Sequence, residues 1–457
     1  MDIVQQLEQI FHPRGVAVIG ASNKPGNLGG FFLRGFLQQG FDVDRLYVVH
    51  PSENDVFGVR AFPSVNDIPG DLDLAIVFSP RDAVLDIVND CVSRSVRGVV
   101  ICTSGFAENG LDGWRLQQEI TRIARLNGTR IIGPNCLGIY CPESKLVNYA
   151  GIMPKEAGTV GMFSQSGSMT VSFPIAASGM GIYFNKVVSC GNECDLTAAD
   201  FLEYFWRDSG IEIVVGYIEG VADGRRLFDI ARRVSGEKPI LLWKGGTSDA
   251  GRQSAVTHTG ALAGSTRVWD AVFKQSGMVS IESEDELLDY LQGFYYLPLP
   301  RGNRVAVVSA TGGLAVTIAD ACTAYGLEIV RLSDRTKRRL KSLVPAVGTC
   351  VENPIDLGMM SSFNLQITLD SLETLAKDEQ VDMIIKTVGG SSPEMVSKEI
   401  EALKGFSKPI IYISDPAMRV TMEAPKPVKG VAIYTSGRRA AQVASKLVQY
   451  QRFRSGD

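Results

Sequence analysis

The chain has 457 residues, of which 45% are hydrophobic and 21% are charged, and its formal net charge is −4. This composition is typical of a soluble globular protein of about three domains, and so small a net charge excludes a strongly basic surface for nucleic acid or membranes. No apolar run approaches the roughly 18 residues of a transmembrane span. The acidic start excludes a signal peptide, and eight cysteines without CxxC pairs favour reduced thiols in the cytoplasm over a structural metal site.

Short apolar runs recur along the chain, with amphipathic stretches between them. The runs are Val16–Gly20, Leu46–His50, Leu74–Ser79, Gly98–Thr103 and Thr129–Gly133, then Thr159–Ser164, Lys186–Ser189, Ile213–Ile218, Pro239–Trp243 and Met278–Ile281, then Arg304–Ser309, Leu327–Arg331, Val381–Thr387, Pro409–Ser414 and Gly430–Thr435. Runs that are apolar throughout suit strands covered on both faces, and their alternation with helices implies parallel sheets. We therefore expect an α/β protein with three doubly wound parallel-sheet domains, at residues 1–140, 141–300 and 301–457.

The first domain opens with a strand, four glycines and a helical stretch, written VAVIGASNKPGNLGG from Val16 to Gly30. Glycine lets a phosphate approach the backbone, and the N-terminus of a helix favours negative charge. The glycine spacing is not GxGxxG, and the second strand ends in His50-Pro51, where an NAD site offers a carboxylate to the ribose. A nucleotide that is not recognised through a carboxylate on its ribose fits better, and coenzyme A is such a nucleotide. The candidate binding residues of this turn are Gly20, Ala21, Ser22, Pro25 and Gly26.

Small and polar residues also follow the later strands of the first domain. In an open parallel sheet, these carboxyl ends of strands face the ligand crevice. Ordinary turn chemistry explains each pair equally well when it is taken singly. The additional candidates for the same site are Ser79, Pro80, Ser104, Gly105, Asn135 and Cys136.

The second domain opens with a strand that ends at Ser164 and a turn that leads into a helix of small residues. Hydroxyls and free N–H groups at a helix N-terminus form an anion site, although an ordinary helix cap has the same sequence. The pattern is not the GxSxG of a hydrolase, because Ser164 stands where glycine is needed. The candidate phosphate-binding residues are Ser164, Gln165, Ser166 and Gly167.

The stretch from Lys244 to Gly264 follows an apolar strand and carries His258, one of three histidines. Its Gly, Ser, Thr and Ala residues have little core to bury, so we expect a movable loop. Imidazole is largely uncharged near neutral pH and is a good nucleophile. Glu219 follows a strand of the same domain and would orient the ring by one hydrogen bond. A surface histidine and a solvated carboxylate are the alternative interpretations.

The third domain repeats the pattern of a strand, a glycine-bearing turn and a helix. The turn is Thr311, Gly312 and Gly313. It provides a second helix N-terminus for an anion. Two such helix ends facing one another would hold a phosphorylated side chain.

Taken together and in this order, the motifs resemble the α subunit of ADP-forming acetyl-CoA synthetase, in the superfamily that includes succinyl-CoA synthetase. The matching stretches are VIGAS from Val18, SGFAE from Ser104, GPNCLG from Gly133, FSQSG from Phe163, GNECD from Gly191, YIEGVADGRR from Tyr217, THTGALAG around His258 and NPIDLG from Asn353. The resemblance covers essentially the whole chain. It implies a Rossmann-like coenzyme A-binding domain followed by two flavodoxin-like domains.

The resemblance also implies roles for individual residues. His258 matches the histidine that is transiently phosphorylated, and Glu219 matches the glutamate that orients it. The turns at Ser164–Gly167 and Thr311–Gly313 match the phosphate sites, and the opening glycine turn with GPNC matches the coenzyme A site. The chain departs from the family's usual sequences at three places. It has GNECD where GNKAD is more usual, and its second strand ends in His-Pro where Asn-Pro is usual. It also has SGSMT where SGAL is more common. These departures leave acyl specificity open.

The implied reaction is the interconversion of acyl-CoA, ADP and phosphate with the acid, coenzyme A and ATP. It proceeds through an acyl phosphate and phosphohistidine. We expect a separate ATP-grasp β subunit that binds ADP or ATP with Mg²⁺, and an α2β2 assembly. Two alternatives remain. One is a non-catalytic coenzyme A-binding regulatory protein of the same fold. The other is an NAD-dependent dehydrogenase, which the glycine spacing disfavours.

Overall fold

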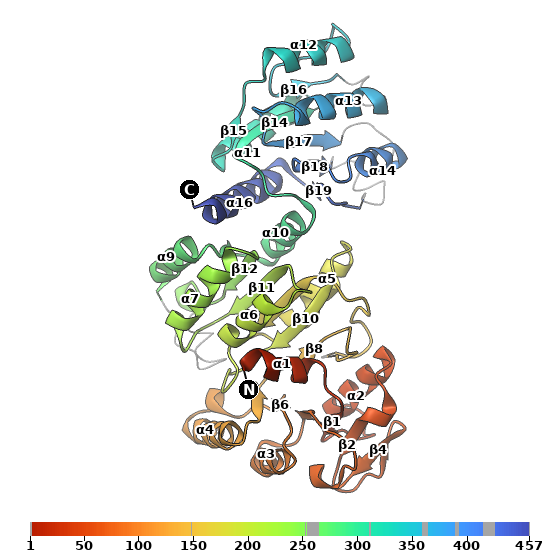
Figure 1. The fold of residues 1–457 in the computed structure, drawn as a ribbon, viewed down its shortest axis with the longest axis vertical. Coiled ribbons are helices and arrows are strands. Elements are labelled where there is room, and N and C mark those ends of the chain that lie inside the picture. The colour runs from red at the N-terminus through yellow and green to blue at the C-terminus, as the bar shows by residue number, and fades with distance from the viewer. Residues whose placement is uncertain are drawn as a thin grey trace. The chain divides into compact units, whose positions relative to one another are not determined.

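The computed structural model describes residues 2–147, 149–251, 253, 265–309, 312–358, 364–388, 393–414 and 426–456. The chain forms two compact units, Met1–Glu282 and Ser283–Asp457, each with its own sheets and helices (Figure 1). Among the helices that these residues form, none is long and apolar enough to cross a membrane.

The first sheet has the strand order β3-β4-β2-β1-β5-β6-β7. Its strands are β1 (Val16–Ile19), β2 (Leu46–Val49), β3 (Asp55–Val56), β4 (Val59–Phe62), β5 (Leu74–Val77), β6 (Gly98–Ile101) and β7 (Arg130–Ile132). Its helices are α1 (Ile3–Phe11), α2 (Leu28–Gln39), α3 (Val84–Ser93) and α4 (Leu111–Leu126). Strands β4, β2, β1, β5, β6 and β7 pair in parallel in the order of a Rossmann sheet.

The second sheet has the order β13-β12-β11-β9-β10-β8. Its strands are β8 (Ile139–Tyr140), β9 (Val160–Ser164), β10 (Phe184–Ser189), β11 (Ile213–Ile218), β12 (Ile240–Lys244) and β13 (Val279–Ile281). Its helices are α5 (Met169–Ser178), α6 (Ala198–Arg207), α7 (Gly224–Ser235) and α9 (Thr266–Ser276). The five parallel strands have the flavodoxin order, with α5 on one face and α6 and α7 on the other (Figure 1).

The third sheet, in the second unit, has the order β15-β14-β17-β18-β19, and β16 pairs with β14. Its strands are β14 (Arg304–Ser309), β15 (Glu328–Ile329), β16 (Ile355–Asp356), β17 (Met383–Val388), β18 (Ile410–Ser414) and β19 (Val431–Tyr434). Its helices are α10 (Glu284–Tyr296), α11 (Gly312–Ala324), α12 (Asp334–Leu343), α13 (Leu365–Ala376), α14 (Pro393–Ala402) and α16 (Gly437–Ser455). This is the flavodoxin order again.

The expected fold class, three doubly wound α/β sheets, is therefore confirmed. All fifteen expected strands are present, and the wholly apolar runs are buried throughout, as in β1, β5 and β6. The sequence did not predict β3, β8 and β16, which have two residues each, or β4, which has four; β8 pairs antiparallel with β10. The domain boundaries at residues 140 and 300 stay a prediction.

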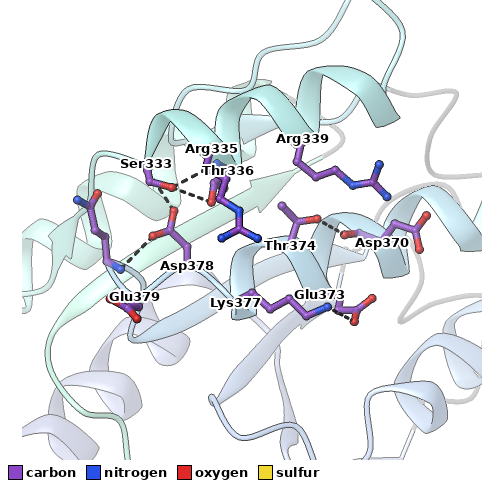
Figure 2. Close-up of a pocket in the computed structure, with 11 residues that line it drawn as sticks. Ser333, Arg335, Thr336, Arg339, Asp370, Glu373, Thr374, Lys377, Asp378 and Glu379 are labelled. Carbon is purple, nitrogen blue, oxygen red and sulfur yellow. Dashed lines mark hydrogen bonds and ion pairs between the residues drawn. The ribbon is translucent and has the colours of Figure 1, made fainter.

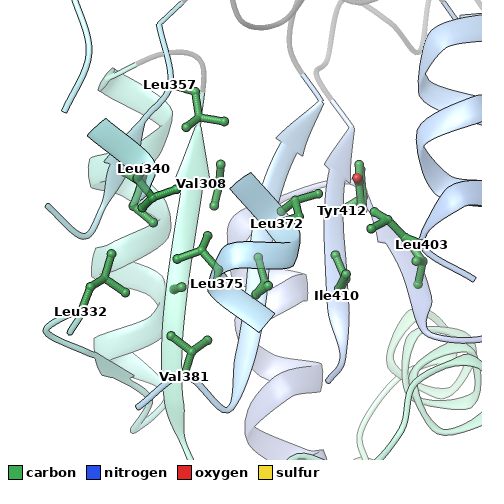
Figure 3. Packing of buried hydrophobic residues seen from close by; sticks show 14 of the residues in the cluster. Val308, Leu332, Leu340, Leu357, Leu372, Leu375, Val381, Leu403, Ile410 and Tyr412 are labelled. Carbon is green, nitrogen blue, oxygen red and sulfur yellow. The ribbon is translucent and has the colours of Figure 1, made fainter. Parts of the chain in front are cut away.

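Aliphatic side chains from strands and helices fill the space on one side of the third sheet (Figure 3). Val308 from β14 and Ile410 from β18 meet Leu340 from α12 and Leu372 from α13, and all four are at most 1% exposed. Burial of such side chains stabilises the sheet by about 1.5–3 kcal/mol each. The rigid sheet fixes where its strands end.

Asp195 ties the first sheet to the second within the first unit. Its fully buried carboxylate accepts hydrogen bonds from Nε of Arg125 at 2.5 Å, from Nε of Arg130 at 2.8 Å and from the N–H of Ile131 at 2.9 Å. Removing one partner of a buried ion pair leaves the other charge without compensation. The last residue of GNECD is thus a structural anchor.

We expect Asp195→Ala to lower the free energy of unfolding of the first unit by about 3 kcal/mol. All four tryptophans lie in this unit, so their fluorescence during urea titration reports on it. Asp229→Ala is the matched control, because Asp229 forms an exposed ion pair with Arg225 worth less than about 1 kcal/mol. Equal destabilisation by both substitutions would contradict the anchoring role.

Candidate functional site

The first candidate site lies at the carboxyl ends of β1 and β5, where the strand order of the first sheet reverses. Gly20 follows β1 with a φ of +89°, and a Cβ there would lie 3.0 Å from the backbone nitrogen of Ser79, which follows β5. Only glycine tolerates this conformation and this approach. Open α/β sheets bind their ligands at such a reversal. The structure therefore places Gly20 and Ser79 side by side at the expected edge.

Asn27 organises the glycine turn, and its role was not predicted. Its Oδ1 accepts the N–H of Ser22 at 3.0 Å and the N–H of Gly30 at 2.6 Å, while its Nδ2 donates to the carbonyl of Gly20 at 3.2 Å. A Cβ on Gly30 would lie 2.4 Å from the carbonyl oxygen of Ser22. The first turn of α2 therefore rests directly on the glycine turn. An asparagine at the N-cap position was the signal that could have revealed it.

The other predicted residues of this site follow β5, β6 and β7 along the same edge. The Thr103 hydroxyl donates to the Ser79 carbonyl at 2.6 Å, and the N–H of Asn135 donates to the Thr103 carbonyl at 3.0 Å. The N–H of Gly105 donates to the carboxylate of Glu108 at 2.6 Å. The remaining candidates on this edge are Ala21, Ser22 and Cys136, which are buried, and Pro25 and Gly26, which are exposed in the turn. Pro80 and Ser104 follow Ser79 and Thr103 directly.

The second candidate site lies where β9 and β11 end, at the reversal of strand order in the second sheet. Gln165 joins the two strand ends: its Oε1 accepts the N–H groups of Glu219 at 2.6 Å and Gly220 at 3.1 Å, and its Nε2 donates to the Gly220 carbonyl at 2.8 Å. The Ser164 hydroxyl accepts the N–H of Ser166 at 3.0 Å. Four predicted residues are thereby brought to one edge.

Glu219 is 8% exposed and lies between two side chains from neighbouring strands. The hydroxyl of Tyr217 donates to its Oε1 at 3.2 Å. The buried ammonium of Lys244, the last residue of β12, donates to the Glu219 carbonyl at 2.7 Å and to the Gly245 carbonyl. Lys244 opens the glycine-rich segment, but the sequence assigned it no role. It places a positive charge at this edge.

His258 and Thr311 lie outside the described residues. The described ends of the segment that carries His258 are close together, because the Thr266 hydroxyl donates to the Thr247 carbonyl at 3.2 Å. Its start lies beside the turn of Glu219, since the N–H of Gly245 donates to the Ile218 carbonyl at 2.9 Å. Gly312 and Gly313 begin α11 in the second unit.

Residues after β10 connect the two edges. Nδ2 of Asn192 donates to Oε2 of Glu108 at 2.5 Å and to Oε1 of Gln117 at 3.1 Å, both from the first sheet's side. Partial burial opposes the ionisation of Glu108, but hydrogen bonds from Asn192 and from the backbone of Gly105 and Phe106 outweigh it and lower its pKa. Glu108 is thus a charged anchor for the connection.

The turn that contains Gly167 also approaches the segment GPNCLG closely. A Cβ on Gly167 would lie 2.7 Å from Cγ of Leu137. The N–H of Leu137 in turn donates to the hydroxyl of Ser189, at the end of β10, at 2.9 Å. The glycine is therefore required for close approach of the two edges.

A cavity of about 670 Å³ lies elsewhere, between α12 and α13 of the second unit (Figure 2). At the end of α13, the Lys377 ammonium donates to the Glu373 carboxylate at 2.6 Å. The Asp378 carboxylate accepts the N–H of Ser333 at 3.1 Å. Arg335 also lines the cavity. None of the predicted site residues that the structure describes lines it, so the cavity is separate from both candidate sites.

Two domain families match the chain. The CoA binding domain family matches residues 14–142, and the succinyl-CoA ligase like flavodoxin domain family matches residues 157–294. The matched ranges contain the two edges described above.

The chain is 36% identical to the α subunit of ADP-forming acetate–CoA ligase II of Pyrococcus furiosus, over 97% of each chain. It is 33% identical to ADP-forming acetate–CoA ligase I of Archaeoglobus fulgidus, over 87% of this chain and 57% of that longer protein. A solved structure of the dinucleotide-forming acetyl-coenzyme A synthetase 1 of Ca. Korarchaeum cryptofilum, in complex with phosphate and ADP, superposes with a TM-score of 0.86 and 30% identity, over 98% of this chain and 97% of that one.

Proposed function

The chain belongs to the family of ADP-forming acetate–CoA ligases, and we propose that it is an α subunit in which His258 carries the phosphoryl group. The proposed reaction interconverts acyl-CoA, ADP and phosphate with the acid, coenzyme A and ATP. The first domain binds coenzyme A, and the two flavodoxin-like domains handle phosphate, with boundaries at residues 140 and 300. The proposed chemistry is that of an acid–thiol ligase.

The proposed reaction has three balanced steps. A phosphate oxygen attacks the acyl carbonyl carbon, the C–S bond breaks, and coenzyme A leaves as a thiolate that takes up a proton. The neutral imidazole of His258 then attacks phosphorus, and the acid leaves as a carboxylate. Finally a β-phosphate oxygen of ADP attacks the phosphohistidine, which regenerates the imidazole. Positioned donors stabilise the charge that develops on the phosphoryl oxygens.

One observation carries the proposal: the start of the segment that bears His258 lies at the same strand ends as Glu219. The N–H groups of Glu219 and Gly220 donate to Oε1 of Gln165, which fixes the backbone there, and the Tyr217 hydroxyl donates to the Glu219 carboxylate and fixes its position. A fixed carboxylate beside an imidazole selects one tautomer and leaves the other nitrogen as the nucleophile. Glu219 is proposed to do this for His258.

Two helix N-termini are the proposed binding sites for the phosphoryl group. One is the turn at Ser164, Gln165, Ser166 and Gly167, and the other is Thr311 with Gly312 and Gly313. Free N–H groups and the helix dipole favour an anion at such positions. The first helix N-terminus is proposed to bind the phosphoryl group of the acyl phosphate. The second is proposed to bind the phosphorylated histidine.

The proposed coenzyme A site is the edge formed by the glycine turn and the strand ends of the first sheet. We expect Gly30→Ala to raise the dissociation constant for coenzyme A about tenfold, the loss of one charge-assisted hydrogen bond. The new Cβ would lie 2.4 Å from the Ser22 carbonyl and push α2 away from the turn. Isothermal titration with coenzyme A measures the change.

Gly224→Ala is the matched control for this substitution, because a Cβ on Gly224 meets no atom within 4 Å. Its coenzyme A affinity should equal that of the wild type. Unchanged affinity in Gly30→Ala would move the coenzyme A site away from the glycine turn.

The partner is proposed to be an ATP-grasp β subunit that brings ADP or ATP with Mg²⁺, in an α2β2 assembly. The name of the Pyrococcus furiosus relative as an α subunit supports a partner chain. The proposed location is the cytoplasm. The structure of the Korarchaeum relative holds phosphate and ADP, which supports the same substrates here.

The testing experiment mixes the chain and its β subunit with acetyl-CoA, ADP, Mg²⁺ and ³²P-phosphate. We expect ATP and free thiol in equal amounts, and an acid-labile label on the chain during turnover. A panel of acyl-CoA substrates then identifies the preferred acid. Coenzyme A binding without thiol release or label, for every substrate, would support the non-catalytic alternative.

A further inference from the structure

Lys244 is a buried lysine at the carboxyl end of β12, and the three proposed reaction steps assign it no part. It is 4% exposed and pairs in register with Ile218, the last residue of β11. Taking an ammonium out of water is costly, and an apolar side chain of similar size is often at least as stable in its place. The reason for the charge therefore lies in the groups that the ammonium contacts.

The ammonium of Lys244 connects the chain segments that leave two neighbouring strands. Its Nζ donates to the carbonyl of Glu219, the first residue after β11, at 2.7 Å, and to the carbonyl of Gly245, the first residue after β12. The strand pairing ends at Ile218 and Lys244, and beyond it the N–H of Gly245 donates to the Ile218 carbonyl at 2.9 Å. Lys244 thus fixes the start of the segment that carries His258 against the turn that carries Glu219.

A second contact joins the same two chain segments. The Tyr217 hydroxyl donates to Oε1 of Glu219 at 3.2 Å, and a Cβ on Gly245 would lie 2.5 Å from that hydroxyl oxygen. A side chain at Gly245 would therefore displace the hydroxyl from the Glu219 carboxylate, so glycine is required for this close approach. The carboxylate and the start of the segment are held in one arrangement by two separate contacts.

The helix that follows the segment reaches the same ammonium. The ring centroid of Trp269, on α9, lies 5.8 Å from Nζ of Lys244, which is within the range of a cation–π contact. The Thr266 hydroxyl, at the start of α9, donates to the Thr247 carbonyl at 3.2 Å. Both described ends of the segment therefore lie near Lys244.

We propose that Lys244 is a positioning residue for phosphoryl transfer, whose ammonium sets the distance between the Glu219 carboxylate and the segment that carries His258. The inference rests on the proposed function. A carboxylate orients an imidazole through one hydrogen bond, and a misplacement of about 1 Å can cost about 10²-fold in rate. Lys244 therefore acts in the step in which His258 takes the phosphoryl group, and not in the step that joins the acyl group to coenzyme A.

The test measures these two steps separately in Lys244→Met, in the complex with the β subunit and without nucleotide. Both assays start from acetyl phosphate. In the first, the thiolate of coenzyme A attacks the acetyl carbonyl carbon, phosphate leaves, and the thioester is measured. In the second, the imidazole of His258 attacks phosphorus of ³²P-acetyl phosphate, the bond from phosphorus to the acetyl oxygen breaks, and acetate leaves. Rapid quench then measures the labelled chain.

We expect Lys244→Met to be labelled about 10²-fold more slowly than the wild type and to form acetyl-CoA at the wild-type rate. Acetyl-CoA formation also shows that the variant is folded and binds both substrates. Labelling at the wild-type rate overturns the proposal. Equal slowing of both reactions also overturns it, because Lys244 would then support the whole edge and not one step.

Lys238→Met is the matched control, because Lys238 lies just before β12, at the opposite end of the same strand. Its Nζ also donates to two carbonyls, those of Phe205 at 2.9 Å and Asp208 at 2.7 Å. The control loses the same kind of hydrogen bonds, and both of its rates should equal those of the wild type. Slowing of the label as large as in Lys244→Met would reveal a general effect of the sheet and overturn the positioning role.

A double variant tests whether Lys244 acts through Glu219. In Glu219→Gln the carboxylate charge is absent, so its distance from His258 no longer matters. Adding Lys244→Met should then slow the labelling by less than about twofold, whereas independent residues would multiply their effects. A further slowing of about 10²-fold in the double variant overturns the proposal.

His258→Ala separates this inference from the function on which it rests. Absence of the label in His258→Ala, together with wild-type labelling of Lys244→Met, overturns the inference alone. Label that persists in His258→Ala overturns the proposed function and the role of Lys244 with it.

Discussion

Replacing His258 by alanine should abolish ATP formation from acyl-CoA, ADP and phosphate, a loss of at least about 10⁴-fold in rate. The substitution removes the nucleophile that is proposed to accept the phosphoryl group. The other two histidines of the sequence cannot replace it, because His12 follows α1 and His50 follows β2 in the first domain. The acid-labile label on the chain should disappear. Acyl phosphate should still form, with release of one free coenzyme A thiol for each acyl phosphate, because its formation needs only the proposed phosphate and thioester sites.

His50→Ala is the control for the loss of a histidine. Nδ1 of His50 accepts the N–H groups of Ser52 at 3.3 Å and Glu53 at 3.2 Å, which is the role of a turn residue. This variant should retain the label and the turnover. Label that persists in His258→Ala would refute the assignment of the phosphoryl carrier.

Replacing Glu219 by glutamine should slow phosphorylation of His258 on the order of 10²–10³-fold, the usual effect of removing one preorganised electrostatic group. Glutamine has the same shape and still accepts the Tyr217 hydroxyl, so the turn should keep its fold. What is lost is the negative charge that is proposed to lie beside the imidazole of His258, to select its tautomer and to stabilise the positive ring. Rapid-quench measurement of the labelled chain gives the rate.

Glu212→Gln is the matched control, because Glu212 precedes the same strand at its opposite end. It is exposed, and its Oε2 accepts the Thr159 hydroxyl at 3.3 Å. The substitution should leave the rate unchanged. A loss of similar size in both variants would show that Glu219 acts through the strand and not through its position at the site.

The strands were predictable from the sequence because a strand buried on both faces leaves a continuous apolar run. The parallel strands β9, β11 and β12 are such runs, and the polar or glycine residues that follow them mark the edge of the second candidate site. The antiparallel strand β8 was missed because it has only two residues, Ile139 and Tyr140, within a motif that reads as a turn. Two apolar residues are too short a run to indicate a strand, although both are of strand-forming types.

The contacts that build the site were not predictable in the same way. Gln165 was expected to bind phosphate through its place in a turn, yet its side chain binds the backbone of Glu219, more than fifty residues away. Lys244 and Asn192 received no role because Glu219, Glu108 and Gln117, to which they donate, lie far away along the chain. GNECD was noticed as a departure, but nothing in the motif separates the anchor Asp195 from Glu193. Only the folded sheets bring such partners together.

The van der Waals contact between Gly167 and Leu137 has a thermodynamic consequence. The two residues belong to different edges, so a ligand that displaces Leu137 also shifts the turn of Gly167. By reciprocity, whatever factor coenzyme A imposes on the affinity for phosphate, phosphate must impose on the affinity for coenzyme A. The affinities of the two proposed sites are then coupled through the packing of the Leu137 side chain against the backbone of Gly167.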